Sequence, residues 1–286
     1  SLPIPAFAKM PDNPAQELEV LRERVARSRE EIASTRYAEA VKADVQNWMD
    51  SDSSLYTWAP YQVVYDSPDK IQKSTAKEAA SIVLPLGEAV RGAKKELLFV
   101  SPYFVPRKTG IESFRELRDR GIRVRVITNS LASTNHSVVH SGYAPSRKPL
   151  LKMGVGLYEV RPDAVVSGTE KVGNASAGGS LHTKAFVVDR QSLFVGSFNL
   201  DPRSANLNTE LGVIIESPEL ASQVVDWVDQ ELSTSTYEVT LDDQGKLRWT
   251  GQSDGEPEIW TKEPQTGFWR RFNVSLFRLL PIKGQL

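Results

Sequence analysis

Two apolar runs on either side of a short polar connection constrain the fold of this chain more than any other feature. Residues 182–188 and 193–199 are rich in Val, Phe and other strand-forming side chains, whereas residues 189–192 are all polar. This pattern predicts an antiparallel hairpin with a four-residue connection, in which residue 188 pairs with residue 193. The chain must therefore build part of a sheet here.

The predicted hairpin carries polar side chains that a purely structural hairpin would not need. Because side chains alternate between the faces of a strand, His182 and Lys184 share one face, and so do Ser197 and Asn199. In the predicted register Lys184 lies opposite Ser197, and His182 lies opposite Asn199, roughly 5 Å apart. Each residue alone has an ordinary explanation, such as a core histidine or a turn-forming Asn. Together they bring an imidazole, an ammonium, a hydroxyl and an amide to one surface.

Such a group of side chains suits phosphoryl transfer. The non-bridging oxygens of a phosphodiester need hydrogen-bond donors and positive charge, which Lys184, Ser197 and Asn199 can supply. The imidazole of His182 can attack phosphorus or protonate a leaving alcohol. A carboxylate on its other ring nitrogen would fix the tautomer, and Glu210 is the candidate for that contact.

Strand and helix patterns alternate through the middle of the chain. Strands are expected at 96–101, 123–128, 156–160, 182–188, 193–199 and 211–215, and helices at 76–93, 111–120, 149–153 and 218–232. This rhythm predicts an α/β fold with a mixed, largely parallel central sheet sandwiched by helices (α/β/α). Pro85 predicts a kink or a late start in the helix of 76–93, and the polar stretch 129–140 predicts a long loop.

Three parts of the chain differ in character. Residues 1–50 predict helices at 14–32 and 37–48, the first with Asn13 as N-cap, and residues 51–235 hold the α/β lobe. Residues 236–286 predict short strands followed by an amphipathic end. There Trp269, Phe272, Leu276 and Leu279/Leu280 recur at helical spacing near Arg270, Arg271 and Arg278. This end either lies on an anionic membrane surface or packs on the lobe.

Composition limits the possible classes of protein. With 40% hydrophobic and 25% charged residues, the chain has the profile of a soluble globular protein, and no run of about 18 apolar residues predicts a transmembrane helix. A net charge of −1 argues against a general nucleic-acid binder. With no cysteine and three histidines, the chain offers few ligands for a metal site.

The spacing of the polar residues in the hairpin resembles the HKD motif of the phospholipase D superfamily. The resemblance implies that the His is a covalent nucleophile or general acid/base, that the Lys, Ser and Asn bind phosphate, and that a downstream acid orients the His. It further implies that the Asp and Gly of the motif are structural, and that no metal or cofactor is needed. The residues concerned here are His182, Lys184, Asp189, Gly196, Ser197, Asn199 and Glu210.

Other segments resemble the second half of bacterial cardiolipin synthases. They are Ser101–Pro106, Thr128–Leu131, Val139–Tyr143, Arg147–Leu150 and Phe268–Phe272. The resemblance implies a phospholipid substrate, two HKD lobes around one site, and a place in the bacterial cytoplasm, peripheral at the inner membrane. Because one motif is present, we expect a C-terminal half whose partner lobe is either an N-terminal half or a second copy. Asn135-His136 departs from the family, in which an acidic and then an apolar residue are more usual.

The resemblance also implies a division of roles between two lobes. In two-motif members the second His is usually the general acid/base, so His182 would protonate the leaving glycerol oxygen and then deprotonate the incoming alcohol. The phosphohistidine would form on the other lobe, whereas in a homodimer His182 would take both roles. The alternatives are a phospholipase D-type phosphodiesterase or nuclease that uses water, and a non-catalytic binding lobe. The charge balance and the amphipathic end favour lipid over nucleic acid.

Three further features are candidates for the site. Tyr103 follows a predicted strand, where α/β sheets place their ligands. His140 either lines the entrance to the site or makes a structural hydrogen bond. Residues 163–180, rich in Gly, Ser, Ala and Asn, form either a lid or a plain connecting loop.

Overall fold

The computed structural model describes residues 13–33, 57–68, 70, 81–163, 180–253 and 256–277. The chain divides into two compact units, residues 1–58 and 59–286. The first contains α1 (Pro14–Ala33), where Oδ1 of Asn13 accepts a hydrogen bond from the N–H of Gln16 (3.4 Å). The expected helix of 37–48, most of the loop of 163–180 and the last nine residues lie outside the described residues. The three-part division stays a prediction.

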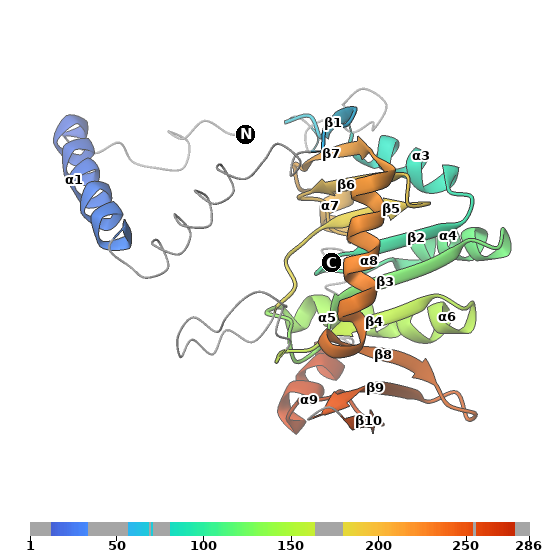
Figure 1. Ribbon diagram of the computed structural model, residues 1–286. Coiled ribbons are helices and arrows are strands. Elements are labelled where there is room, and N and C mark those ends of the chain that lie inside the picture. The colour runs from blue at the N-terminus through green and yellow to red at the C-terminus, as the bar shows by residue number, and fades with distance from the viewer. Residues whose placement is uncertain are drawn as a thin grey trace. The chain divides into compact units, whose positions relative to one another are not determined.

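Ten strands in the described part of the second unit form one sheet (Figure 1). Its strand order is β1–β7–β6–β5–β2–β3–β4–β8–β9–β10. The strands are β1 (Tyr61–Tyr65), β2 (Glu96–Val100), β3 (Arg123–Asn129), β4 (Gly156–Val160), β5 (Ala185–Val188), β6 (Ser192–Gly196), β7 (Leu211–Glu216), β8 (Thr236–Leu241), β9 (Leu247–Ser253) and β10 (Glu256–Trp260).

Helices lie on both faces of this sheet (Figure 1). They are α3 (Val83–Gly92), α4 (Arg107–Asp119), α5 (Ser137–Tyr143), the 3₁₀ helix η3 (Ala144–Ser146), α6 (Arg147–Lys152), α7 (Pro202–Asn206), α8 (Pro218–Ser235) and α9 (Phe268–Phe277). Helix α3 begins two residues before Pro85, and residues 76–80 of the expected helix lie outside the described residues, so the expected kink or restart stays a prediction. Helix α5 begins inside the stretch expected to be a loop.

The central strands are buried on both faces, and alternate side chains supply two separate cores. Leu97 and Phe99 of β2 pack in the core that contains residues of α3, α4 and α6. Leu98 and Val100 of the same strand pack in the core that contains Val225 and other residues of α8. This division follows from the two-residue period of a strand. The predicted α/β fold, with helices on both sides of the sheet, is therefore confirmed.

The sheet is mixed, but the prediction that it is largely parallel is wrong. Strands β2, β3 and β4 run parallel to one another, and every other described pairing in the sheet is antiparallel. Parallel neighbours need a crossover segment, which α4 and α6 provide between these three strands. Successive strands from β5 to β7, and from β8 to β10, have shorter connections and form antiparallel meanders.

The hairpin of β5 and β6 forms as predicted, but its register is shifted by one residue. Val188 pairs with Ser192 instead of residue 193. Asp189 and Arg190 have φ values of 54° and 53°, and the N–H of Gln191 donates to the carbonyl of Val188 (2.9 Å). Two residues with positive φ make the tight turn that matches the twist of a hairpin. Lys184 therefore lies opposite Gly196 instead of Ser197. The polar residues of the motif lie just outside the strands, because β5 begins after Lys184 and β6 ends before Ser197.

A close approach of β6 and β7 explains why the motif contains a glycine. Gly196 pairs with Gly212 across the two strands. A Cβ atom on Gly196 would lie 2.5 Å from the carbonyl oxygen of Leu211 and 2.7 Å from Cα of Gly212. Both neighbours are main-chain atoms and cannot move aside as a flexible side chain could. A side chain here would separate the strands where the motif begins.

We predict that Gly196→Ala lowers the free energy of unfolding by roughly 1–3 kcal/mol, because the added methyl group must push the β6 and β7 backbones apart. Gly92→Ala is the matched control. A Cβ on Gly92 would meet nothing within 4 Å, so its effect should be neutral or stabilising by about 0.5–1 kcal/mol. Urea unfolding monitored by circular dichroism measures both, and equal effects would contradict the close-approach explanation.

Candidate active site

The predicted motif residues gather at one edge of the sheet because of the directions of three strands. Strands β5, β6 and β7 are antiparallel neighbours, so the start of β5, the end of β6 and the start of β7 meet at the same edge. The residues immediately before β5, after β6 and before β7 are His182, Lys184, Ser197, Asn199 and Glu210. The structure thus brings together residues from three separate parts of the sequence.

Lys184 and Asn199 form the buried part of this cluster. Their exposed fractions are 9% and 8%. Nζ of Lys184 donates to the main-chain carbonyl of His182 (2.7 Å), and the described residues offer it no ion pair. Burial lowers the pKa of Lys184, although the charge of Glu210 opposes this shift. Oδ1 of Asn199 is buried without a hydrogen-bond partner among the described residues. An anionic oxygen could accept from this ammonium, and a ligand hydroxyl could donate to this amide oxygen.

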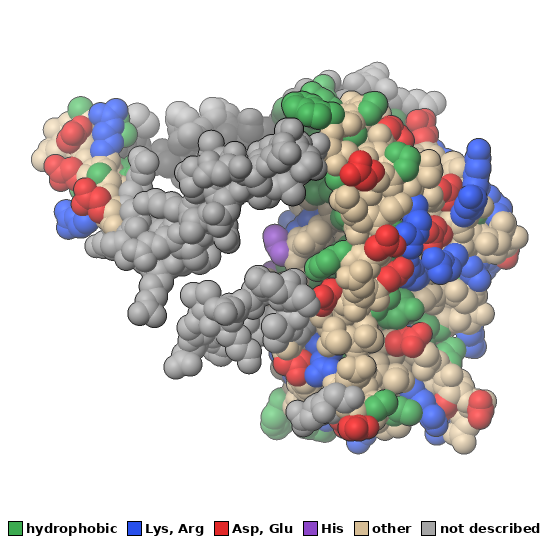
Figure 2. All heavy atoms as spheres, in the orientation of Figure 1, with side chains coloured by type: hydrophobic (Ala, Val, Ile, Leu, Met, Phe, Trp, Pro, Cys, Tyr) green, Lys and Arg blue, Asp and Glu red, His purple; other side chains and the backbone are tan. Residues whose placement is uncertain are grey.

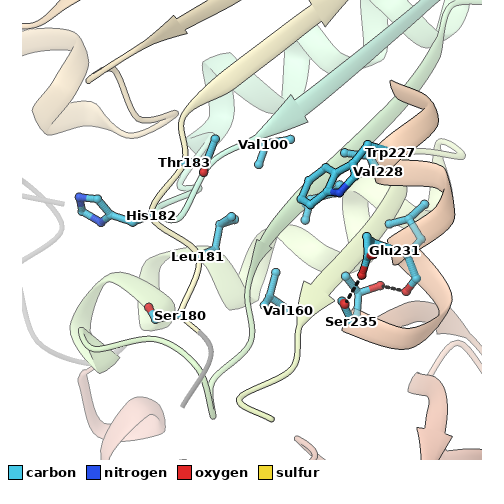
Figure 3. A pocket seen from close by; sticks show the side chains of 13 residues that line it. Val100, Val160, Ser180, Leu181, His182, Thr183, Trp227, Val228, Glu231 and Ser235 are labelled. Carbon is cyan, nitrogen blue, oxygen red and sulfur yellow. Dashed lines mark hydrogen bonds between the residues drawn. The ribbon is translucent and has the colours of Figure 1, made fainter. Parts of the chain in front are cut away.

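The imidazole of His182 is exposed and points away from the labelled side chains of α8 (Figure 3). In the described part of the chain, no hydrogen bond engages the ring. The main chain beside it is held firmly, because the side chain of Asn129 bonds both main-chain groups of Leu181. The N–H of Leu181 donates to Oδ1 (2.9 Å), and its carbonyl accepts from Nδ2 (3.0 Å). The ring is therefore accessible, and its point of attachment is fixed.

Glu210 binds other members of the cluster instead of His182. Its buried carboxylate accepts hydrogen bonds from Oγ of Ser197, from Oγ of Ser204 (2.8 Å) and from Nδ2 of Asn208 (3.2 Å). Among the residues that the structure describes, none of its bonds reaches the imidazole of His182. The predicted orienting contact is thus not formed here. The contacts of Glu210 position Ser197 at the end of β6.

A buried ion pair behind Glu210 had no signal in the sequence. Nζ of Lys70 lies 2.7 Å from Oδ2 of Asp66, and both side chains are almost wholly buried. Asp66 accepts from the N–H of Glu210 (3.0 Å), and Lys70 donates to the carbonyls of Ser204 and Asn208 (2.9 Å each). An Asp and a Lys four residues apart are common in any chain. Their role depends on contacts with residues more than 130 positions away, so no local pattern reveals it.

Tyr103 lies beside the cluster, as its place after a strand suggested. Phe104 forms an isolated β-bridge with Leu200, which follows Asn199 directly. The Tyr103 hydroxyl donates to Oδ1 of Asn135 (3.0 Å), and its ring meets the edge of His136 (5.6 Å between centroids). Burial raises the pKa of Tyr103, the bond to Asn135 lowers it, and the charge of Asp201 raises it. The Asn-His pair that departs from the family thus contacts this tyrosine.

His140 lies in a different, buried cluster. Of the two roles considered for it, lining the entrance to the site or making a structural contact, the structure favours the structural contact. Its Nε2 is 2.6 Å from Nη2 of Arg147 and 3.5 Å from Oε1 of Glu263. Arg147 also forms ion pairs with Glu263 (2.7 Å) and with Glu159. Only 3% of His140 is exposed. The contact with Glu263 ties α5 to the segment that precedes α9.

Asp189 lies at the opposite end of β5 from Lys184 and makes structural contacts. Its two carboxylate oxygens accept hydrogen bonds from the N–H groups of Lys94, Lys95 and Glu96 (2.7–2.8 Å). Burial raises the pKa of Asp189, but these main-chain donors outweigh burial, so the pKa lies below its ordinary value. The motif Asp therefore holds the turn of the hairpin against the start of β2.

A family model described as the PLD-like domain of cardiolipin synthase matches residues 86–232, just over half of the chain. The chain belongs to this family. The matched span includes every motif residue from His182 to Glu210, whereas Asp66 and Lys70 lie outside it. The family assignment is also what the spacing of the HKD motif indicated.

Individual relatives agree with the family assignment. Cardiolipin synthase C of Escherichia coli (strain K12) is 36% identical over 231 residues, which cover 80% of this chain and 49% of that protein. Cardiolipin synthase A of Pseudomonas aeruginosa (strain LESB58) is 28% identical over 187 residues, covering 65% of this chain and 33% of that protein. The chain thus spans half or less of the length of these curated relatives.

A solved structure of phosphatidylserine synthase from Haemophilus influenzae Rd KW20 is also similar to this chain. It has 15% sequence identity and a TM-score of 0.47, over 66% of this chain and 42% of that one. Within the described residues of this chain, no helix is both long and apolar enough to span a bilayer. The same residues contain no group of three or more His, Asp or Glu side chains placed to hold a metal ion.

An apolar pocket of about 330 Å³ lies next to the motif (Figure 3). Strands β2, β3 and β4 supply one wall, α8 supplies another, and residues 180–183 supply the third. The side chains that line it are mainly apolar and include Val100, Ile127, Val160, Leu181, Trp227, Val228 and Leu232. His182 contributes to the wall, although its imidazole points outward.

We predict that Lys70→Met lowers the free energy of unfolding by roughly 3–5 kcal/mol, because it leaves the buried carboxylate of Asp66 without its cation. Lys152→Met removes an exposed Lys from the last turn of α6 and should change stability by no more than about 0.5–1 kcal/mol. Chemical denaturation of both variants tests this. A Lys70→Met protein as stable as Lys152→Met would show that the pair does not hold the cluster.

We predict that acid weakens the buried cluster around Glu263. Burial raises the pKa of Glu263, but the Arg147 guanidinium and the bond to His140 lower it to about 2. A folded-state pKa below the unfolded value of about 4.3 means that this carboxylate stabilises the fold above pH 4.3. The contribution, on the order of 3 kcal/mol, is lost as the pH falls from 4.3 toward 2.

Stability curves between pH 2 and 7 check this prediction with Glu263→Gln as the comparison. The variant should be less stable than the wild type at neutral pH, and the difference should shrink in acid, because Gln carries no charge to lose. A difference that stays constant with pH would show that the Glu263 carboxylate does not contribute through its charge.

Proposed function

We propose that this chain supplies one HKD half-site of a cardiolipin synthase-like enzyme that transfers phosphatidyl groups between phospholipids. The observation that carries the proposal is the arrangement at the sheet edge. The buried ammonium of Lys184 bonds the main-chain carbonyl of His182, whose imidazole is exposed, and the buried Asn199 follows β6 at the same sheet edge. An unpaired ammonium in a partly buried site favours a bound anion, and a phosphodiester carries one negative charge.

The reaction needs two histidines, of which this chain supplies one. In the first step, a histidine on the second lobe attacks phosphorus and forms a P–N bond, while the P–O bond to the leaving alcohol breaks. His182, protonated beforehand, gives its proton to the leaving oxygen. In the second step, neutral His182 takes the proton of the incoming alcohol, whose oxygen attacks phosphorus and releases the first histidine. Lys184 and the side-chain N–H groups of Asn199 hold the phosphate through both steps, and Ser197 joins them when its hydroxyl turns from Glu210 to a phosphate oxygen.

The second lobe is either the N-terminal half of a longer chain or a second copy of this one. The ring of His182 is accessible and has no partner among the described residues, and Glu210 of this lobe is engaged by Ser197 and Ser204. An orienting carboxylate could therefore come from the second lobe. The reaction requires no metal or cofactor in this scheme, since Lys184 supplies the positive charge and His182 moves the proton.

Surface chemistry supports a lipid substrate and peripheral binding at an anionic membrane. Basic and acidic side chains are interspersed on the visible face of the second unit, without the large basic area that nucleic-acid binding would favour (Figure 2). On α9, Phe268, Trp269 and Phe272 have exposed fractions of 65%, 72% and 47%. Exposed aromatic residues on one helix suit the interface of a bilayer.

We predict that His182→Ala lowers the transfer rate by roughly 10²–10⁴-fold, the usual contribution of a general acid/base. The assay uses phosphatidylglycerol vesicles with this chain alone and with a separately expressed second lobe, and mass spectrometry detects cardiolipin and glycerol. Lys184→Met should lose activity too, because the phosphate loses its cation. Lys94→Met removes an exposed Lys at the far end of the hairpin and should leave the rate unchanged.

Three outcomes decide between the candidate functions. Cardiolipin formation that requires His182 supports the transferase. Formation of phosphatidic acid instead, with the same dependence on His182, would indicate a hydrolase that uses water. An unchanged rate in His182→Ala would show that the catalytic role assigned to this residue is wrong.

A further inference from the structure

The pocket beside His182 has the size and the position of a ligand site. Its volume of about 330 Å³ lies at the lower end of the range of small-molecule pockets, roughly 300–1,000 Å³. It is bounded by the carboxyl-terminal parts of the parallel strands β2, β3 and β4, through Val100, Ile127 and Val160. Parallel sheets bind their ligands beyond these ends.

One short segment joins this pocket to the motif. Leu181 points into the pocket and His182 points out on the other side (Figure 3). The main chain of Leu181 is fixed by the buried side chain of Asn129, as described above. A single substrate with a phosphate group and an apolar chain could therefore reach both sides of this segment.

The side chains of the pocket wall suit an apolar ligand. Two polar side chains of the α8 wall and its end are already paired, since Oγ of Ser235 donates to Glu231 (3.0 Å) and Oγ1 of Thr236 donates to the carbonyl of Leu232 (2.5 Å). A hydrocarbon would leave these two hydroxyls satisfied, and the other hydroxyl-bearing residues of the wall, Ser180 and Thr183, are exposed to water. Trp227, the largest side chain of the wall, is 49% exposed and would lose contact with water when the pocket fills.

We propose that this pocket binds one acyl chain of the phosphatidyl donor, so that the donor is recognised by its hydrocarbon as well as by its phosphate. The proposal rests on the proposed function, because the donor is the molecule that carries both groups. It assigns Leu181, Val160 and Trp227 to the recognition of the chain, separately from the phosphate-binding residues.

Because the chain has six tryptophans, the share of fluorescence quenching that Trp227→Phe removes from the wild-type signal provides the test with the full chain. The probe is monomeric phosphatidylglycerol with two hexanoyl chains that carry bromine at their ends, used below its critical micelle concentration. Bromine quenches a nearby indole. We expect saturable quenching in the wild type that exceeds the quenching in Trp227→Phe, in which the five other tryptophans report any binding elsewhere. Absence of quenching in the wild type overturns the proposal without relying on the folding of any variant.

Two comparisons identify which part of the lipid binds. Lengthening the acyl chains by one methylene should strengthen binding about fourfold until the pocket is full. Glycerophosphoglycerol, which has no acyl chains, should displace the probe only at far higher concentrations than unbrominated dihexanoyl phosphatidylglycerol does. Binding that is independent of chain length would overturn the proposal. So would brominated hexanoate binding as tightly as the lipid, because the site would then recognise hydrocarbon without its phosphate.

A substitution that fills the pocket with a larger side chain provides the complementary test. Val160→Phe places a ring inside the cavity and should weaken binding of the probe at least tenfold. Val63→Phe makes the same substitution on the exposed edge strand β1 and should leave binding unchanged. Thermal unfolding confirms that both variants are folded. Equal affinities of the two variants would contradict an acyl chain in this pocket.

The binding and transfer assays separate failure of this proposal from failure of the proposed function. Chain-dependent quenching of Trp227 without any lipid product would support the pocket and count against the transferase. Transfer that requires His182, but is equally fast for all chain lengths and in Val160→Phe, would support the transferase and overturn the pocket.

Discussion

The buried carboxylate of Glu210 is the constraint on which the candidate site depends. A carboxylate that is removed from water must be satisfied by hydrogen bonds, and Ser197, Ser204 and Asn208 satisfy this one. Because Ser204 also accepts a hydrogen bond from the main chain of Asn199 (3.2 Å), the carboxylate of Glu210 positions both Ser197 and Asn199. An unsatisfied Glu210 would thus disturb two elements of the motif at once.

Local patterns were sufficient to predict much of the fold. Strand β4 has the predicted bounds, and α8 begins at Pro218 with Ser217 as its cap, because alternation, periodicity and capping are properties of neighbouring residues. The register of the hairpin was missed for a physical reason. Asp189 and Arg190 adopt positive φ although neither is Gly, and the Asp189 side chain is bound to N–H groups more than 90 residues away. Such a turn depends on tertiary contacts, so its neighbours in the sequence do not reveal it.

The candidate site shows the same limit. Spacing identified the residues that meet at the sheet edge, and the antiparallel order of β5, β6 and β7 explains why they meet. Spacing could not show which groups bond to one another. Glu210 was expected on His182 because both belong to one motif, yet burial favours the nearest donors, which are hydroxyl and amide groups. Asp66 and Lys70 come from the chain around β1, and only the fold brings them behind Glu210.

The separation of polar and apolar groups at residues 181 and 182 follows from backbone geometry. In an extended segment, consecutive side chains point to opposite sides, so a residue that faces the pocket places its neighbour on the other side. Asn129 fixes this orientation by bonding the main chain, which leaves both side chains free to act. A change at Leu181 that preserves the main-chain bonds would therefore alter the pocket without moving the attachment of His182. Under the two proposals, recognition of hydrocarbon and transfer of protons can thus vary independently, although they are assigned to consecutive residues.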